Sequence, residues 1–365
     1  MRHTRVTAAV ALAATLASCT TGKHTPSFNP TPKPTHPGQV VIIAGDPNIH
    51  RPPRDGEYAL RASAHSNGGL ALDQRTGAVY FPVTGEMGKV VARLERNGSI
   101  SALPIGIGAD QLFAAGGQLW MMLSSAGVHL VKVNLSTLEK TDVLGADGEA
   151  RTRFEVLDPL AKVVSTEERD ELGKHWKGSL FTIRGDGVPV LISSAGQLFE
   201  VVGRNALRRW RPQGYEKALS EAAPAPFQPT GLIPDGRRGI VTLGHTGLLR
   251  VGDDGASRGF RFPATVQKMP PWTEMAPLSN GSILLLGGVS ALEQRPRPTL
   301  LKLDGSLESL SFGTQKKCDD FNGSMAAVAS AKPTGMVKSA DGAYVMGDKY
   351  CGLIYSFRLP DHISG

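Results

Sequence analysis

Gly239-Ile-Val-Thr-Leu-Gly-His-Thr-Gly-Leu-Leu-Arg-Val251 contains two short apolar runs on either side of a small turn. Each run has the length and the β-branched or apolar composition of a strand. Asp-Gly pairs at 235–236 and 254–255 flank the stretch. Such pairs are typical of tight hairpin turns, because both residues tolerate positive φ. The stretch therefore predicts consecutive antiparallel strands of one sheet.

The same pattern occurs six times along the chain. The second strand of each unit begins at a glycine, and these are Gly77, Gly117, Gly187, Gly239, Gly281 and Gly342. A third apolar strand follows in each unit, starting at residues 90, 129, 198, 247, 299 and 353. Units of about 50 residues with four short strands each are the signature of a β-propeller. We therefore predict an all-β, six-bladed β-propeller over residues 39–360. One or two β-sandwiches are the alternative, but they would not need the same motif six times.

The two ends of the repeat region predict how the ring closes. The last unit supplies only three strands between residues 333 and 359, whereas residues 39–44 form a lone apolar strand before the first unit. Pairing this N-terminal strand with the last blade would remove an open sheet edge. We therefore expect the first strand of the domain to complete the sixth blade.

Three further segments depart from the repeat. Residues 149–177 form an insertion that is expected to be partly helical, with Ser165 and Glu168 at the spacing of a capping box, and residues 214–223 predict a second short helix. The basic stretch 204–211 is predicted to be an outer edge strand of the third blade, where charge prevents aggregation. Docking of this stretch to anionic lipid or wall polymer is the alternative.

The openings of several units resemble those of the NHL family of six-bladed propellers. Gly69-Leu-Ala-Leu-Asp73, Pro229-Thr-Gly-Leu-Ile-Pro-Asp235 and Pro333-Thr-Gly-Met-Val337 are similar to that family's Pro-x-Gly-x-x-x-Asp start, although the last lacks the Asp. The segment from Val41-Ile-Ile-Ala-Gly45 into Gly69 is also similar to the start of an NHL domain. The resemblance covers residues 39–359. It implies a propeller that presents a rigid face to partners, and it implies no particular activity.

The N-terminus predicts where the protein works. Arg2 and Arg5 precede an apolar run at 6–16, as in a secretory signal peptide, which is too short to span a bilayer. Leu16-Ala17-Ser18-Cys19 resembles the bacterial lipobox, which implies a signal at residues 1–18 and lipidation of Cys19. An ordinary signal with a chance cysteine is the alternative. Residues 19–38 are rich in Pro and Thr and predict an extended, disordered linker. The expected location is the extracytoplasmic face of the cell membrane, where the lipid anchor makes the membrane a partner.

The net charge of the chain indicates which classes of partner to expect. The chain has 40 Lys and Arg against 33 Asp and Glu, a formal charge of +7. This modest excess favours anionic headgroups or wall polymers and makes a poor case for nucleic acid, which the export signal also disfavours.

If Cys19 carries lipid, Cys318 and Cys351 remain as an even pair in an oxidising compartment, and a disulfide between them is expected. Two separate thiols are the alternative.

No common catalytic motif is present in the sequence. G-x-S-x-G, H-E-x-x-H, C-x-x-C and the P-loop pattern are all missing, so we assign no catalytic residue. In a propeller, the loops that enter each blade and those that join its second and third strands share one face. The candidate binding residues on this channel face are His65, Asn67, Glu86, Asp110, His245, Trp272, Glu274, Asp348 and Lys349.

Two chemical hypotheses concern this face, and both compete with the interpretation that these are ordinary surface residues. Gluconolactonase-like six-bladed enzymes hold a divalent cation with Glu, Asn and Asp at the channel mouth. The side chains that would suit calcium here are Asn67, Glu86, Asp110, Glu274 and Asp348. Nothing in their spacing selects them, so no cofactor or metal ligand is assigned. His65 and His245 are candidates for acid and base.

The sequence thus predicts an extracytoplasmic, lipid-anchored β-propeller that acts as a binding or scaffolding module. Its partner is a protein, a cell-envelope polymer or a small molecule. The alternative is an exported metal-dependent hydrolase of the lactonase type, or a lyase, with its site at the channel mouth.

Overall fold

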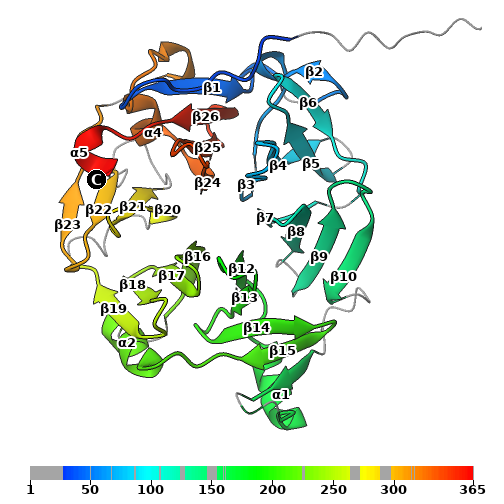
Figure 1. Cartoon of the computed structure of the whole chain (residues 1–365), viewed down its shortest axis with the longest axis vertical. Coiled ribbons are helices and arrows are strands. Elements are labelled where there is room, and N and C mark those ends of the chain that lie inside the picture. Colours follow the sequence, from blue (N-terminus) through cyan, green and yellow to red (C-terminus); the bar gives the residue numbers. More distant parts are fainter. Residues whose placement is uncertain are drawn as a thin grey trace, which may run out of the picture.

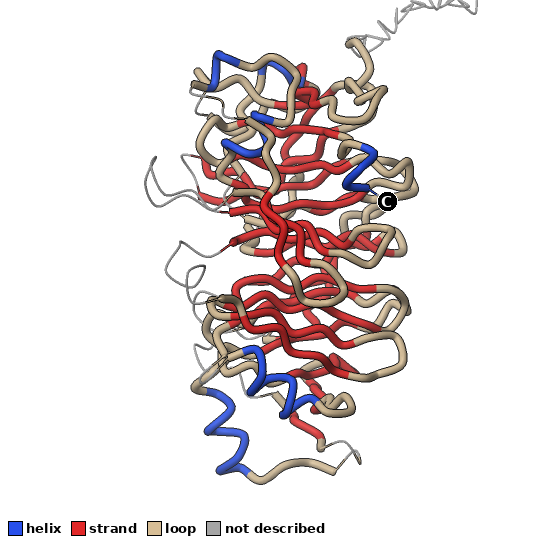
Figure 2. Tube along the Cα trace, turned by 90° about the vertical axis from the view of Figure 1, so that its left-hand side faces the viewer, coloured by secondary structure: helices blue, strands red, loops and turns tan. Residues whose placement is uncertain are grey.

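The computed structural model describes residues 28–364 except 50, 67, 86–87, 107, 124–127, 146–153, 159, 161, 224–226, 264–271, 288–296, 314 and 316. These described residues form six sheets arranged as blades around a central axis, with a few short helices at the periphery (Figure 1). Seen from the side, the ring is a thin disc with helices and loops projecting from it (Figure 2). The predicted all-β, six-bladed propeller is confirmed.

The first three blades are antiparallel meanders that begin at the channel and end at the rim. Blade 1 contains β3 (Ala71–Leu72), β4 (Val79–Gly85), β5 (Gly88–Leu94), β6 (Ser99–Ala102) and, outside them, β2 (Glu57–Tyr58). Blade 2 contains β7 (Gln111–Ala115), β8 (Gln118–Leu123), β9 (His129–Asn134) and β10 (Lys140–Leu144). Blade 3 contains β12 (Leu180–Ile183), β13 (Pro189–Ile192), β14 (Leu198–Gly203), β15 (Ala206–Arg209) and β11 (Glu155–Leu157).

The other three blades follow the same plan with four strands each. Blade 4 contains β16 (Pro229–Asp235), β17 (Gly239–Gly244), β18 (Gly247–Val251) and β19 (Ser257–Arg261). Blade 5 contains β20 (Trp272–Pro277), β21 (Ile283–Gly287), β22 (Thr299–Leu301) and β23 (Leu307–Ser309). Blade 6 contains β24 (Pro333–Lys338), β25 (Tyr344–Asp348), β26 (Leu353–Phe357) and β1 (Val40–Ala44).

The second strand of a blade is among its most deeply buried parts. Every residue of β17 and of β25 is buried. The reason is that neighbouring sheets pack face to face, so both faces of these strands meet apolar side chains. Between blades 5 and 6, for example, Leu286 belongs to one cluster with Tyr355 and Phe357. Burial on both faces explains the unbroken apolar runs that identified the repeats.

The N-terminal strand closes the ring as predicted. β1 pairs antiparallel with β26, with Val40 opposite Phe357. Gly45 follows β1 with φ of +110°, a conformation that side chains rarely adopt. A Cβ there would lie 2.3 Å from the carbonyl oxygen of Gly352, so no residue other than glycine fits at this position. The first and last parts of the domain therefore share one sheet.

The insertion before blade 3 covers the outer edge of that blade. β11 pairs in parallel with β15, and α1 (Thr166–Gly173) follows it. Ser165 Oγ accepts a hydrogen bond from the Glu168 N–H at 3.2 Å, which is one half of the predicted capping box. The basic segment does form an outer strand, β15, but β11 lies outside it, so β15 is not the edge that was predicted. Its Arg209 forms an ion pair with Glu168 at 2.6 Å.

Short helices occupy the remaining connections. The predicted helix at 214–223 is α2 (Tyr215–Ala222). The others are η1 (Ala59–Arg61), η2 (Cys318–Asp320), α4 (Ala326–Ser330) and α5 (Asp361–Ser364). Among the residues that the structure describes, no helix is both long and apolar enough to cross a membrane.

The signal at residues 1–18 and Cys19 lie outside the described residues. The described part of the predicted linker, residues 28–38, contacts the propeller. The Phe28 ring stacks on Tyr58 with centroids 5.1 Å apart, and the Thr31 N–H donates to the Arg96 carbonyl oxygen at 2.9 Å. Arg358 Nε donates to the Pro34 carbonyl oxygen at 3.1 Å. This stretch is therefore held along the rim, and any free linker ends before it.

Candidate functional site: the central channel

The centre of the ring contains a cavity of about 550 Å³. The first strand of every blade contributes to its wall, namely β3, β7, β12, β16, β20 and β24. Each of these inner strands contacts the next around the ring. The cavity size falls within the range of small-molecule sites in proteins. It is the best-formed hollow in the described part of the chain, and we treat it as the candidate site.

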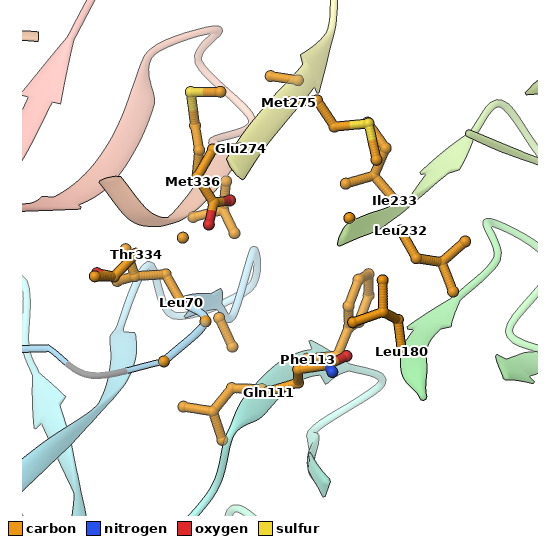
Figure 3. A pocket seen from close by; sticks show the side chains of 18 of the residues that line it. Leu70, Gln111, Phe113, Leu180, Leu232, Ile233, Glu274, Met275, Thr334 and Met336 are labelled. Atoms are coloured by element: carbon orange, nitrogen blue, oxygen red, sulfur yellow. The ribbon is translucent and has the colours of Figure 1, made fainter. Parts of the chain in front are cut away.

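Apolar side chains make up most of the channel wall. Figure 3 shows those contributed by different blades, and they are Leu70, Phe113, Leu180, Leu232, Ile233, Met275 and Met336. The methionines are flexible and polarisable, and they adapt to ligands of different shape. A ligand in this channel would therefore bury apolar surface against all sides.

Several polar groups of the wall serve the fold. Gln111 Nε2 donates to the Ser179 carbonyl oxygen at 3.2 Å, and its Oε1 accepts from the Phe181 N–H at 2.8 Å, so this side chain ties blade 2 to blade 3. Thr334 Oγ1 has no hydrogen-bond partner among the described residues. That oxygen lies 2.6 Å from where a Cβ on Gly347 would be, so it faces β25.

Glu274 differs from Gln111 and Thr334 in the direction of its side chain. Its carboxylate points into the cavity from β20 (Figure 3), and within the described residues nothing forms a hydrogen bond or ion pair with it. Burial raises the pKa of Glu274 to about 8, because the apolar surroundings disfavour the charged form. Near neutral pH most copies of this carboxyl are therefore protonated. An unpaired acid in a cavity is a common feature of functional sites.

Two of the predicted channel-face residues line the cavity, Glu274 and Asp110. Asp110 directly precedes β7 in blade 2, whereas Glu274 belongs to blade 5, which lies on the opposite side of the ring. The two residues thus lie on opposite walls of the channel and do not form a pair.

The other described members of the predicted set do not line the cavity. Asp348 is buried, and its Oδ1 accepts hydrogen bonds from the N–H groups of Lys332 and Tyr350, both at 2.9 Å. The Trp272 ring is buried and packs edge-on against Phe262. These residues shape the ends of inner strands and their turns, which is a structural role.

The two histidines are also placed away from the cavity. His65 lies against Gly352, where an added Cβ would come within 2.4 Å of its ring. His245 and Lys349 are exposed on loops that join second and third strands. Neither histidine lines the channel, so the acid and base hypothesis has no geometric support among described residues. Asn67 and Glu86 lie outside the described residues.

The calcium hypothesis also lacks a gathered set of ligands. Among the described residues, no three His, Cys, Asp or Glu side chains are grouped in a way that would hold a metal ion. Asp110 and Glu274 are on opposite walls, and Asp348 is engaged by backbone N–H groups. The chemistry that this part of the structure offers is apolar contact plus one free carboxyl.

The disulfide between Cys318 and Cys351 is confirmed. It joins η2 to the loop between β25 and β26, across 33 residues of sequence. It fixes the segment that contains α4 onto blade 6, next to the face where the inner strands begin.

The apolar residues that form the channel wall are not among the candidates predicted from the sequence. The signal was present in the NHL-like openings 69–73, 229–235 and 333–337, because these are the inner strands themselves or lie directly in them. Their likeness was used to recognise the fold, and their side chains were not considered as a site.

No protein-family model and no curated protein matches the sequence. The fold is similar to that of an auxiliary nutrient binding protein from Bacteroides ovatus, with a TM-score of 0.56 and 8% identity over 88% of this chain and 76% of that one. It is also similar to a gluconolactonase from Xanthomonas campestris, with a TM-score of 0.51 and 10% identity over 89% and 99% of the two chains. Virginiamycin B lyase from Staphylococcus aureus gives a TM-score of 0.50 and 11% identity over 80% and 94%. Such likeness shows the propeller fold alone.

Proposed function

We propose that the protein is a binding module, anchored to the outer face of a membrane through lipidated Cys19, which captures a ligand in its central channel. The observation that carries this proposal is the cavity of about 550 Å³ whose apolar wall comes from all six blades. A closed ring of packed sheets gives such a site a rigid frame, which lowers the entropic cost of binding. The occupant is a small molecule or an extended segment of a protein or envelope polymer.

The NHL-like openings support this role, because that resemblance implies a propeller that presents a rigid face to partners. The nutrient binding protein of similar fold is also compatible with it, although that likeness is one of fold. The lipobox-like Leu16-Ala17-Ser18-Cys19 supports export and anchoring, and two or more acyl chains on Cys19 would make the anchoring stable.

The proposed binding site in the channel is tested by a substitution that reduces the volume of the cavity. Leu180→Trp adds bulk to the wall, while Leu160→Trp makes the same change at a side chain that is 78% exposed at the periphery. A metabolite library is screened by thermal shift against the unlipidated full chain and both variants. Compounds that bind in the channel stabilise the wild type and Leu160→Trp and lose their effect with Leu180→Trp. Compounds that shift all three proteins equally would contradict a channel site.

The anchor is tested separately by metabolic labelling with a palmitate analogue. Cys19→Ser should lose the label and leave the membrane fraction, whereas Cys318→Ser should keep both. A Cys19→Ser protein that stays on the membrane would overturn the lipid anchor. Stoichiometric calcium or zinc in the purified protein, together with lactone hydrolysis or a lyase activity, would favour the enzyme class over the binding module.

A further inference from the structure

We propose that the channel selects ligands that combine an apolar body with one cationic group, such as an alkylammonium, and that Glu274 recognises the charge. This inference rests on the proposed binding role and names the chemistry of its ligand. It follows from what the cavity offers: apolar surface on every side and a carboxyl group that the fold leaves unused.

The position of Glu274 is the first step. Its carboxylate projects from β20 into the cavity and lies near Met336 of the neighbouring β24, whereas Met275 of its own strand points toward β16 (Figure 3). No described side chain or backbone group donates a hydrogen bond to it. The carboxylate is therefore open to whatever occupies the cavity, and ionisable groups left unpaired in a cavity are often functional.

The remaining charges of the channel do not neutralise Glu274. Lys338 is at the far end of β24, where its ammonium lies 3.3 Å from Ser279 Oγ and 5.6 Å from the centroid of the Tyr344 ring. On the other neighbouring inner strand, β16, Asp235 pairs with Arg250. Asp110 adds a second acidic group on the opposite wall. None of these described charges pairs with Glu274, and its carboxylate, when ionised, disfavours an anionic ligand in that part of the cavity.

A cation is the partner that gains most from this arrangement. A carboxylate and an ammonium form a charge-assisted hydrogen bond, which is stronger than a bond between neutral groups and stronger still where water is scarce. Met275, Met336 and, on the opposite wall, Phe113 add polarisable surface for the apolar body of the ligand. A neutral ligand would use the apolar wall and gain little from Glu274.

Proton release provides a signature of this recognition. The pKa of Glu274 is raised to about 8 in the empty channel, so near pH 7 the carboxyl must lose its proton before it can pair with an ammonium. Binding of the cation should then release close to one proton. Its affinity should rise by up to tenfold per pH unit between pH 6 and 8, and a neutral ligand should show no such dependence.

The experiment compares two probes of equal chain length, hexylammonium and 1-hexanol. Both are titrated calorimetrically, in buffers with different ionisation enthalpies, into the full chain carrying Cys19→Ser. In the same protein, Glu274→Gln removes the charge of the side chain and keeps its shape. Glu139→Gln is the matched control at an exposed position. We expect wild type and Glu139→Gln to prefer hexylammonium at pH 8. We expect Glu274→Gln to weaken hexylammonium at least tenfold, to abolish proton release and to leave hexanol nearly unchanged.

Other outcomes separate this inference from the proposed function. If both probes bind with equal affinity and Glu274→Gln changes neither, the channel binds apolar ligands, the binding role stands and cation recognition is overturned. If neither probe binds while the thermal-shift screen yields compounds that depend on Leu180, the inference is again overturned and the binding role stands. If the screen yields only compounds that ignore the channel, the proposed function fails with it.

Discussion

Replacing Glu274 by Gln should make the protein more stable at neutral and alkaline pH. The carboxyl has a raised pKa in the folded state, about 8 against an ordinary value of 4.5, because it is buried in the channel. Below the ordinary pKa the group is protonated in both states and makes no difference. As the pH rises, the unfolded chain releases this proton first, so the unfolded state is favoured and stability falls until the folded pKa is passed.

The magnitude follows from the size of the pKa shift. Each unit corresponds to about 1.36 kcal/mol, so the loss between pH 4.5 and 8 has an upper limit of roughly 4 kcal/mol. The side chain is partly exposed to the cavity, and water that enters the channel reduces the penalty. We therefore expect a loss of about 2 to 4 kcal/mol in the wild type. Gln resembles the protonated acid and does not titrate, so this loss should be absent from the variant.

The assay is urea unfolding of the Cys19→Ser protein at half-unit steps from pH 4.5 to 9. Wild type and Glu274→Gln should have similar free energies of unfolding at the acidic end and should separate steadily above pH 5. Glu139→Gln reports the effect of removing an exposed carboxylate and should run parallel to the wild type. Parallel curves for wild type and Glu274→Gln would refute the claim that the channel buries an unpaired acid. Saturating hexylammonium should reduce the difference between the two curves.

Three further predictions concern the frame around the channel. Removing the disulfide by Cys318→Ser with Cys351→Ser should lower the free energy of unfolding by about 4 kcal/mol, since the bond closes a loop of 33 residues, and an unchanged urea midpoint would contradict this. Arg184→Met should cost about 2 kcal/mol in urea unfolding, because the buried Glu200 loses one of its two arginine partners, at 2.9 Å, and keeps Arg208; adding Glu200→Leu should recover part of the loss, and no recovery would oppose a charge effect. Gly45→Ala should lower the melting temperature by forcing a Cβ against a backbone carbonyl at positive φ, and an unaltered melting curve would argue against the close approach beside β1.

The architecture was predictable because it repeats. The run Ile240 to Leu243 is buried on both faces in β17, and every blade needs such a strand, so the signal recurs at intervals that no single segment would reveal. Ring closure could be predicted by counting strands. The domain begins with a strand that belongs to no unit, and the last unit is one strand short. The disulfide followed from cysteine number and was confirmed by the position of Cys351 beside blade 6.

The channel face was predicted from its loops, and among the described residues only Glu274 and Asp110 of that set line the cavity. Propeller topology does bring such loops to one face, but it does not say which side chains point inward. Asp348 meets the rule and is nevertheless turned into the backbone at Lys332 and Tyr350. A short carboxylate at the end of a strand often accepts N–H groups of its own turn, and that local preference outweighed the expected exposure.

Glu274 was predicted to lie on this face, but no feature of the sequence ranks it above the other candidate residues. Strand alternation depends on a regular register, and the pairing of β20 with β21 shifts between Trp272 and Glu274. The bulge determines that Trp272 is buried in the blade while Glu274 points into the cavity. Composition and periodicity do not reveal a bulge. They also do not reveal that no described group on the other five blades pairs with Glu274. The acid therefore stands out only once the six inner strands, which are far apart in sequence, are assembled around one cavity. The same reasoning gives a rule for other propellers of this kind: an acidic residue in an inner strand, two residues after an aromatic residue at a bulge, is the one to test first as a ligand-recognition group.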